Sequence, residues 1–290
     1  MALIERKIEV NFSMGGDAGG STSLNLSGHR VITNIEVKGG RWVTATAHIF
    51  GMTLSHMNAL TTVPWRPLLL GKNFVQIKAG DAQNGMSVVF NGMIIQAWPD
   101  MQSMPEVALR VDAQVGGWEK VNPKDPTSFE GPTKVSDVHA AIAKKMDATP
   151  ENNGVKAMIN SPYMWGPAYT QMHQLAQATR IGWILENKIL AIWPQGGSRE
   201  SAGSTNISKE TGMVGYPMAA PGGIVVRTLF NKAIAYASQF TIKSDITQAN
   251  GTWVVTGINL ELDSQMPNGR WFAVLYGTPL GDGGSSGSGQ

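Results

Sequence analysis

The stretch Gly251-Thr-Trp-Val-Val-Thr-Gly-Ile-Asn-Leu-Glu-Leu262 decides the kind of fold that this chain adopts. Its valine, isoleucine, threonine and tryptophan residues favour β-strands. Asn250-Gly251 precedes the stretch and Pro267-Asn-Gly269 follows it, and both are turn sequences. We therefore predict a long strand over 251–262, a turn, and a second strand over 271–276.

Strand patterns continue toward the N-terminus. Ile8, Val10 and Phe12 alternate with polar residues, which is the period-2 pattern of a half-buried strand. Glycine-rich turn sequences separate the further strands, which are predicted over 31–37, 42–50, 73–79, 86–98, 106–115, 223–229 and 239–244. Residues 14–23 are dense in glycine and serine and predict a turn or a long loop.

A single short helix is predicted among the first strands, over 52–60. Four of its side chains are expected to share the buried face: Met52, His56, Met57 and Leu60. Pro64 and Pro67 are expected to end it. Six or more strands with one short helix indicate a closed or sandwich-like β domain.

The middle of the chain has a different pattern. Helices are predicted over 138–146, where Ser136-Asp137 supplies the N-cap, and over 169–179. A β-hairpin with its turn at Asn187-Lys188 follows over 181–193. We therefore predict a mainly β protein with a small α+β insert: a first β domain over 1–121, the insert over 122–212, a second β region over 213–280 and a flexible tail over 281–290.

The composition excludes several classes of protein. Of 290 residues only 15% are charged, against roughly 25% in ordinary soluble domains, and the net charge is +2. A polybasic nucleic-acid binder is therefore excluded, and the absence of cysteine excludes disulfides, a thiolate nucleophile and cysteine-based metal sites. The early charges and the absence of an 18-residue apolar run predict neither a secretory signal nor a membrane span, so we expect synthesis and folding in a reducing cytoplasm.

No residue pattern predicts a metal, cofactor or catalytic site. The glycine cluster over 15–20 does not lead into a helix, so a hairpin loop is predicted there instead of a phosphate cradle. The five histidines lack metal-ligand spacing: His29, His48, His56, His139 and His173. His48 is predicted to lie in the core or at an interface. Ser136, Asp137 and His139 have the residue types of a catalytic triad, but at the start of one helix their side chains diverge.

Two hypotheses for a function stay open. A murein hydrolase needs a carboxylate held protonated by an apolar pocket, and Glu186, close to Trp183, is the best candidate, although no partner stands out. A carbohydrate- or peptidoglycan-binding module would rest on the tryptophan-rich hairpin over 181–193. Packing in cores and subunit interfaces is the preferred prediction for the tryptophans in or beside strands: Trp42, Trp98, Trp183, Trp193, Trp253 and Trp271.

A family resemblance covers nearly the whole chain to about Gly277, and the last third is its distinctive part. Thr211-Gly-Met-Val-Gly-Tyr-Pro217 leads into Gly222-Gly-Ile-Val-Val-Arg-Thr-Leu-Phe-Asn231, and then into Asn250-Gly-Thr-Trp253 and Pro267-Asn-Gly-Arg-Trp271. This progression resembles the tail-hub (baseplate hub) proteins of tailed bacteriophages. Its structural signature consists of Tyr216, Pro217, Phe230, Asn231, Trp253 and Trp271. Lys232 stands where a proline is usual and Ala237 where a glycine is common.

The resemblance implies an architecture and a role. Hub proteins are homotrimers in which each copy gives two related β-barrel domains to a six-part ring. The ring joins the central spike to the tail tube or tube-initiator protein, contacts the tape-measure protein, and lets DNA pass during ejection. The implied location is the virion, in the tail or baseplate, and similar rings occur in contractile injection systems. We expect no enzyme activity, and we expect the strands over 86–98 and 251–262, including Val255, to contact other copies.

Overall fold

The computed structural model describes residues 5–15, 21–38, 42–62, 73–81, 83–102 and 104–280. The chain divides into two compact units that alternate along the sequence. Unit 1 consists of Met1–Val37, Trp42–Trp118 and Asn259–Ala273, and unit 2 of Lys38–Arg41, Glu119–Ile258 and Val274–Gln290. The two last strands, β19 (Gly251–Ser264) and β20 (Trp271–Pro279), therefore contribute residues to both units.

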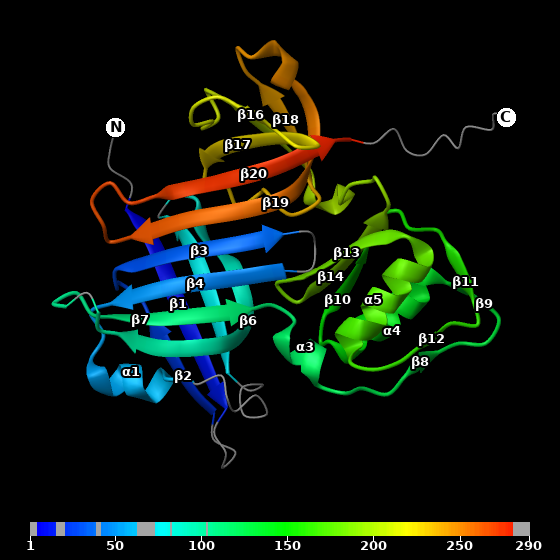
Figure 1. The fold of residues 1–290 in the computed structure, drawn as a ribbon, viewed down its shortest axis with the longest axis horizontal. Helices are drawn as coiled ribbons and strands as arrows, with labels where there is room; N and C mark the ends of the chain where they lie inside the picture. Colours follow the sequence, from blue (N-terminus) through cyan, green and yellow to red (C-terminus); the bar gives the residue numbers. More distant parts are fainter. Residues whose placement is uncertain are drawn as a thin grey trace. The chain divides into compact units, whose positions relative to one another are not determined.

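In its described residues, unit 1 consists of an antiparallel sheet and the short helix α1. Figure 1 shows β1 crossing behind β3 and β4. The strands follow the order β3-β4-β7-β6-β5-β1-β2 within the larger sheet. The elements are β1 (Arg6–Gly15), β2 (Ser21–Leu26), β3 (Val31–Lys38), β4 (Trp42–Phe50), α1 (Leu54–Leu60), β5 (Phe74–Asp81), β6 (Gly85–Asp100) and β7 (Ala108–Gln114).

The long strand β6 bends this sheet. Its first half pairs with β5, from Gly85 opposite Asp81 to Met93 opposite Phe74, and its second half pairs with β7. A register shift interrupts each ladder, and such bulges increase the local twist and bend a strand. Apolar side chains enclosed by the bent sheet form the core, among them Phe12, Ile35, Ile49, Ile77, Phe90, Ile94 and Leu109.

The strand predictions for unit 1 are confirmed to within a few residues, and two other predictions are wrong. β1 extends to Gly15 and β2 begins at Ser21, opposite Gly15, because ladder hydrogen bonds hold these glycine- and serine-rich ends as strand. His56 is exposed, because α1 is only seven residues long and buries Met57 and Leu60 alone. Residues 16–20, Pro64 and Pro67 lie outside the described residues.

The α+β insert lies in unit 2. Figure 1 shows α4 and α5 beside a sheet of order β10-β14-β13. The two long helices are α4 (Val135–Lys145) and α5 (Ala168–Thr179), and the sheet consists of β10 (Thr149–Asn152), β13 (Ile181–Glu186) and β14 (Ile189–Pro194). The minor elements are α3 (Gly117–Val121), β8 (Thr127–Ser128), β9 (Pro132–Lys134), β11 (Met158–Asn160) and β12 (Tyr163–Met164).

Both predicted helices and the hairpin of the insert are confirmed, with one corrected boundary. α4 begins at Val135 after Lys134, which makes no side-chain cap bond, so Ser136 and Asp137 lie inside the first turn. Val135 is buried and its N–H donates to the Ala157 carbonyl, which fixes the earlier start. Sequence reasoning missed β10, because Thr149–Asn152 contains a proline and pairs in parallel with the distant β14.

The remaining elements of unit 2 are mostly strands. They are η1 (Glu200–Ala202), β15 (Ser204–Ser208), β16 (Met218–Ala220), β17 (Gly223–Leu229), β18 (Gln239–Lys243) and η2 (Thr247–Ala249). The predictions for β17 and β18 are confirmed, whereas β15 and β16 are short and were missed. Ala237 has φ +61°, in the left-handed region where glycine is favoured, and this explains why a glycine is expected at its position.

The strands join in one path among the described residues. It runs from β16 through β17, β20 and β19 to β3 and ends at β2, with β18 attached to β19 and β15 to β18. The protein is therefore mainly β, as predicted.

Candidate interaction surface

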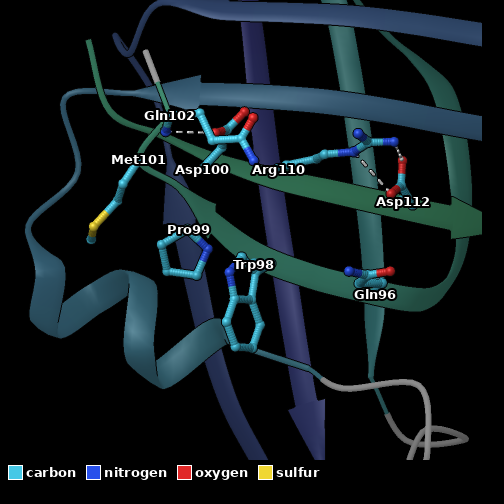
Figure 2. Close-up of a pocket in the computed structure, with 8 residues that line it drawn as sticks. All are labelled: Gln96, Trp98, Pro99, Asp100, Met101, Gln102, Arg110 and Asp112. Atoms are coloured by element: carbon cyan, nitrogen blue, oxygen red, sulfur yellow. Dashed lines mark hydrogen bonds and ion pairs between the residues drawn. The ribbon is translucent and has the colours of Figure 1, made fainter. Parts of the chain in front are cut away.

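Side chains of two neighbouring strands form a hollow on the outward face of unit 1. On β6 the residues Gln96, Trp98 and Asp100 alternate with the buried Ala97, so the three share one face. The register places Trp98 opposite Arg110 of β7 and Gln96 opposite Asp112. Figure 2 shows these side chains together with those of the loop that follows β6. The hollow measures about 680 Å³ and is lined by Gln96, Trp98, Pro99, Asp100, Met101, Gln102, Arg110 and Asp112, here called the Trp98 surface.

Hydrogen bonds fix the polar groups of the Trp98 surface. The Arg110 Nε donates to Asp112 Oδ2 at 3.1 Å, and its Nη2 donates to Asp112 Oδ1 at 3.4 Å (Figure 2). The Thr46 hydroxyl of β4 donates to the same carboxylate at 2.9 Å. Asp100 accepts the backbone N–H of Gln102 at 3.0 Å. These bonds position the guanidinium beside Trp98, a residue that is 50% exposed.

His48 extends the polar face of this sheet by one strand. It lies on β4 opposite Arg110, at intermediate exposure, and so belongs to the outward face and not to the core. Burial lowers the pKa of His48, and Arg110 lowers it further, whereas Asp100 and Asp112 act in the opposite direction. A neutral imidazole beside Arg110 follows at pH 7.

Glu186 is not the isolated carboxylate that its sequence context indicates. Its Oε2 lies 3.5 Å from Arg199 Nη1. Arg199 forms a two-point ion pair with Glu151 of β10, with Nε–Oε1 at 2.6 Å and Nη2–Oε2 at 3.0 Å. Sequence reasoning missed both partners, because they lie 35 and 13 residues away and meet Glu186 only through the fold of the insert.

The environments of the two carboxylates shift their pKa values in opposite directions. The hydrogen bond from Arg199, supported by Asn153 and Ser201, lowers the pKa of Glu151 to about 2. Burial raises the pKa of Glu186, and the nearby Glu151 adds to this, although Arg199 opposes it. A glycosidase keeps the space between its two carboxyl groups for the scissile bond. Here a guanidinium with an 8% exposed side chain binds both carboxylates, so the cluster is built as a crosslink between segments.

The other candidate polar residues are engaged elsewhere. His139 is 1% exposed, and its Nε2–H donates to the Leu190 carbonyl at 2.9 Å. The Ser136 hydroxyl donates to Asp137, so these residues do not form a triad. Among the described residues no three histidine, aspartate or glutamate side chains gather as a metal site. In the same part of the chain, no helix has the length and apolar character needed to cross a membrane.

The tryptophans divide between core and surface. Trp183 and Trp193 are 6% and 8% exposed, so the hairpin of β13 and β14 offers neither ring as a platform for a sugar. Trp183 packs edge-on against Tyr169 at 4.9 Å, and Trp193 packs against Tyr236 at 5.9 Å. Trp98 is the member of the predicted set that is half exposed, and the side chain of Trp42 lies outside the described residues.

The six signature residues do not form one site. Trp271 is buried in unit 1, and Arg6 lies over its ring at 5.6 Å. In unit 2, the Trp253 indole donates to the Ala249 carbonyl at 3.0 Å and the Asn231 side chain accepts the Ala233 N–H. Pro217 is buried and Phe230 half-buried. Tyr216, by contrast, is 60% exposed.

Sequence reasoning singled out Trp98 but not its neighbours Asp100, Arg110 and Asp112. The alternation of Gln96, Trp98 and Asp100 with smaller or apolar residues was a usable signal for one strand face. It does not reveal that β7 is the adjacent strand. The pairing of Trp98 with Arg110 therefore needed the structure.

Solved structures of phage tail proteins share this fold over nearly the whole chain. A tail protein from Neisseria meningitidis MC58 matches with a TM-score of 0.60 at 10% identity, covering 95% of this chain and 97% of its own. The 43 kDa tail protein of prophage MuSo2 from Shewanella oneidensis gives a TM-score of 0.60 at 10% identity, with coverages of 93% and 96%. An E. coli component of the type VI secretion system gives 0.54 at 6% identity, covering 97% of this chain and 75% of its own. The fold is thus that of tail proteins.

The family follows from the sequence match. The family model described as "Baseplate hub gp41" matches residues 44–273, which is well over half of the chain. The chain belongs to this baseplate hub family of phage tail proteins, and the resemblance noted in the sequence is confirmed. No curated protein matches the chain.

Proposed function

We propose that three copies of the chain form a ring in the phage baseplate, which joins the tail tube to the central spike and lets DNA pass during ejection. The match to the baseplate hub family over residues 44–273 carries this proposal. In the ring each copy gives two barrel-like β regions, built on the strands of unit 1 and of unit 2. The partners are the spike, the tube or tube-initiator protein and the tape-measure protein.

The composition and the surface of the chain support the proposal that it forms part of an assembly. A low content of charged residues with 15 methionines and 9 tryptophans suits a chain with several broad interfaces. Large apolar side chains are exposed in both units, including Trp98 in unit 1 and Tyr216 and Met218 in unit 2. Exposed apolar groups of this kind mark surfaces that partners cover.

The ring acts as a structural part and not as an enzyme. Glu186 and Glu151 bind one guanidinium, which fills the place that a murein hydrolase keeps for its substrate. The carbohydrate-binding alternative relied on Trp183 and Trp193, and both are buried. The purified protein is therefore expected to leave peptidoglycan uncleaved. Clearing of purified peptidoglycan that Glu186→Gln abolishes would contradict this part of the proposal.

Light scattering after size exclusion tests the ring directly. The chain has a mass of 31.1 kDa, so a trimer of about 93 kDa is expected at micromolar concentration. Electron microscopy of that species is expected to show a three-fold ring with a central channel. A stable monomer across the micromolar range would contradict the ring. Particles that lack this gene product are expected to have tail tubes without an attached spike.

A further inference from the structure

Exposed large apolar side chains of unit 1 lie around the Trp98 surface. Leu54, Trp98, Met101 and Met104 are 53%, 50%, 39% and 68% exposed. Leu54 begins α1, which packs against β6, and the other three lie on β6 or on its connection to β7. Tryptophan, methionine and arginine are enriched at protein interfaces, and a tryptophan beside an ordered arginine has the composition of a binding hot spot. This composition favours a protein as the occupant.

Asp100 gives the Trp98 surface a charge without a counterion. Arg110 is already paired with Asp112 at 3.1 Å. In the described part of the chain, Asp100 accepts the Gln102 N–H and forms no ion pair. The occupant that fits brings a cation to Asp100 and an apolar group to the face of Trp98.

Unit 2 carries a surface with these properties. A second hollow of about 510 Å³ is lined by Lys209, Glu210, Met213, Gly215, Tyr216, Lys243, Ser244, Asp245 and Asn250, here called the Tyr216 surface. Tyr216 is 60% exposed, and the neighbouring Val214 and Met218 are 37% and 64% exposed. Lys209 lies 3.9 Å from Glu210. Lys243 is exposed and forms no ion pair within 4 Å among the described residues, although its charge helps to lower the pKa of Glu210.

The Tyr216 surface lies at the edge of a sheet, so we expect another chain to cover it. Met218 lies on β16, the terminal strand of the sheet path, which pairs with β17 on one side. The segment before it follows β17 as well, since the Val214 N–H donates to the Arg227 carbonyl. An apolar edge strand left open promotes aggregation unless another chain covers it. The other exposed apolar side chains of unit 2, such as Trp165, do not lie on this edge.

We propose that the Trp98 surface of one copy docks on the Tyr216 surface of the next copy, with Lys243 facing Asp100 and with Tyr216 and Met218 against Trp98. The proposal rests on the ring proposed above. A ring of three copies needs a heterologous contact, in which two different surfaces of the chain meet. One surface in each unit, the first with Asp100 outside any ion pair and the second with the exposed Lys243, and both with exposed aromatic groups, meets that requirement.

Four variants of the full chain and one control variant test the contact by sedimentation equilibrium. Trp98→Ala removes the expected hot spot and should weaken trimer formation at least about 30-fold in dissociation constant. Asp100→Lys and Lys243→Glu should each weaken it, because each places like charges opposite one another. The double variant Asp100→Lys/Lys243→Glu reverses the pair and should restore the trimer to within a few-fold of the wild type. Trp165→Ala, at a 61% exposed tryptophan of the insert, is the matched control and should assemble normally.

The outcomes separate this contact from the ring itself. Circular dichroism and thermal unfolding must first show that the variants are folded, which is expected because Trp98, Asp100 and Lys243 are at least partly exposed. A trimeric wild type whose Trp98→Ala variant assembles equally well would overturn the contact and leave the ring standing. Single charge variants that weaken assembly without mutual rescue would overturn the pairing of Asp100 with Lys243. A monomeric wild type would overturn both proposals.

Discussion

At the scale of single residues, Arg199 joins three segments of unit 2. Its guanidinium binds Glu151 and Glu186, and its backbone N–H donates to the carbonyl of Ala237, the residue in the left-handed conformation. The cluster thus connects β10, β13 and the segment before β18. Removing one partner of a buried ion pair leaves the other charge uncompensated, which is costly.

The two carboxylates of this cluster are predicted to affect stability in opposite directions. Arg199 depresses the pKa of Glu151 from 4.5 to about 2, so its stabilisation is complete above pH 4.5 and is lost as the pH falls toward 2. This difference corresponds to about 3 kcal/mol. Glu151→Gln is expected to lower the free energy of unfolding at pH 7 by about that amount and to flatten its dependence on pH below 4.5. Urea unfolding at pH 7 and pH 3, at one chain concentration, measures both effects.

Glu186→Gln is the matched comparison. Burial raises the pKa of Glu186, so its charged form costs free energy above pH 4.5, and this cost disappears as the pH falls. The substitution is expected to preserve or increase stability at pH 7, since Arg199 keeps its pair with Glu151. A loss at Glu186 as large as that at Glu151 would show that the cluster depends on both ion pairs equally.

At the scale of elements, one buried histidine bonds helix α4 to the sheet of the insert. His139 packs beside Val138 and Ile142 of α4 and donates to the Leu190 carbonyl of β14. Burial lowers the pKa of His139 below 6.5, against the effect of that hydrogen bond. The fold therefore requires the neutral imidazole.

This histidine is predicted to make the insert sensitive to mild acid. As the pH falls below 6.5, the unfolded chain binds a proton before the folded chain does, so stability decreases until the folded pKa is passed. His139→Gln should remove this component and should cost about 1–3 kcal/mol at pH 7.5, because the Leu190 carbonyl loses a well-placed donor. Urea unfolding at pH 7.5 and 5.5 tests it. His56→Gln, at an exposed position of α1, should leave stability at pH 7.5 unchanged.

Sequence patterns predicted most elements because their apolar spacing matches the burial that the structure shows. β4 and β17 bury alternate residues, and α5 buries Met172, Leu175 and Ala176 on the side that was predicted. The failures share one cause. β10, β15 and β16 are short, and they are strands because other strands pair with them. In segments this short, the alternation of apolar and polar residues covers too few positions to distinguish a strand from a turn.

At the scale of the whole molecule, the last two strands contribute to both units. Residues 259–273 belong to unit 1, and Ser264 and Gln265 bond to His29 and Glu5 across more than 230 residues of sequence. Val255 of β19 is 1% exposed, so Val255→Glu would damage the core before it tested any contact between copies. The Trp98 surface is the better place to probe assembly.

The predicted first domain is therefore not expected to fold as an isolated fragment. A chain of residues 1–121 lacks the part of β19 that neighbours β3, so it exposes an apolar strand edge. It should aggregate or show no cooperative unfolding. A fragment of residues 122–203 contains α4, α5 and the sheet β10-β14-β13 with its Arg199 cluster, and it should fold. Circular dichroism and proton–nitrogen NMR spectra of both fragments, beside the full chain, provide the comparison. A well-dispersed spectrum of 1–121 would contradict the role given to the last strands.

The sequence by itself determined the strand-rich class, the α+β insert, the absence of cysteine chemistry and the hub family, because these follow from local periodicity, composition and a long motif progression. Only the tertiary structure decided that Trp98 lies beside Arg110 while Trp183 and Trp193 are buried, and that Glu186 shares Arg199 with Glu151. These neighbours come from distant parts of the chain. Their proximity depends on which strands pair and in which register. Bulges in strands such as β6 change that register, and a local sequence pattern does not predict where they occur.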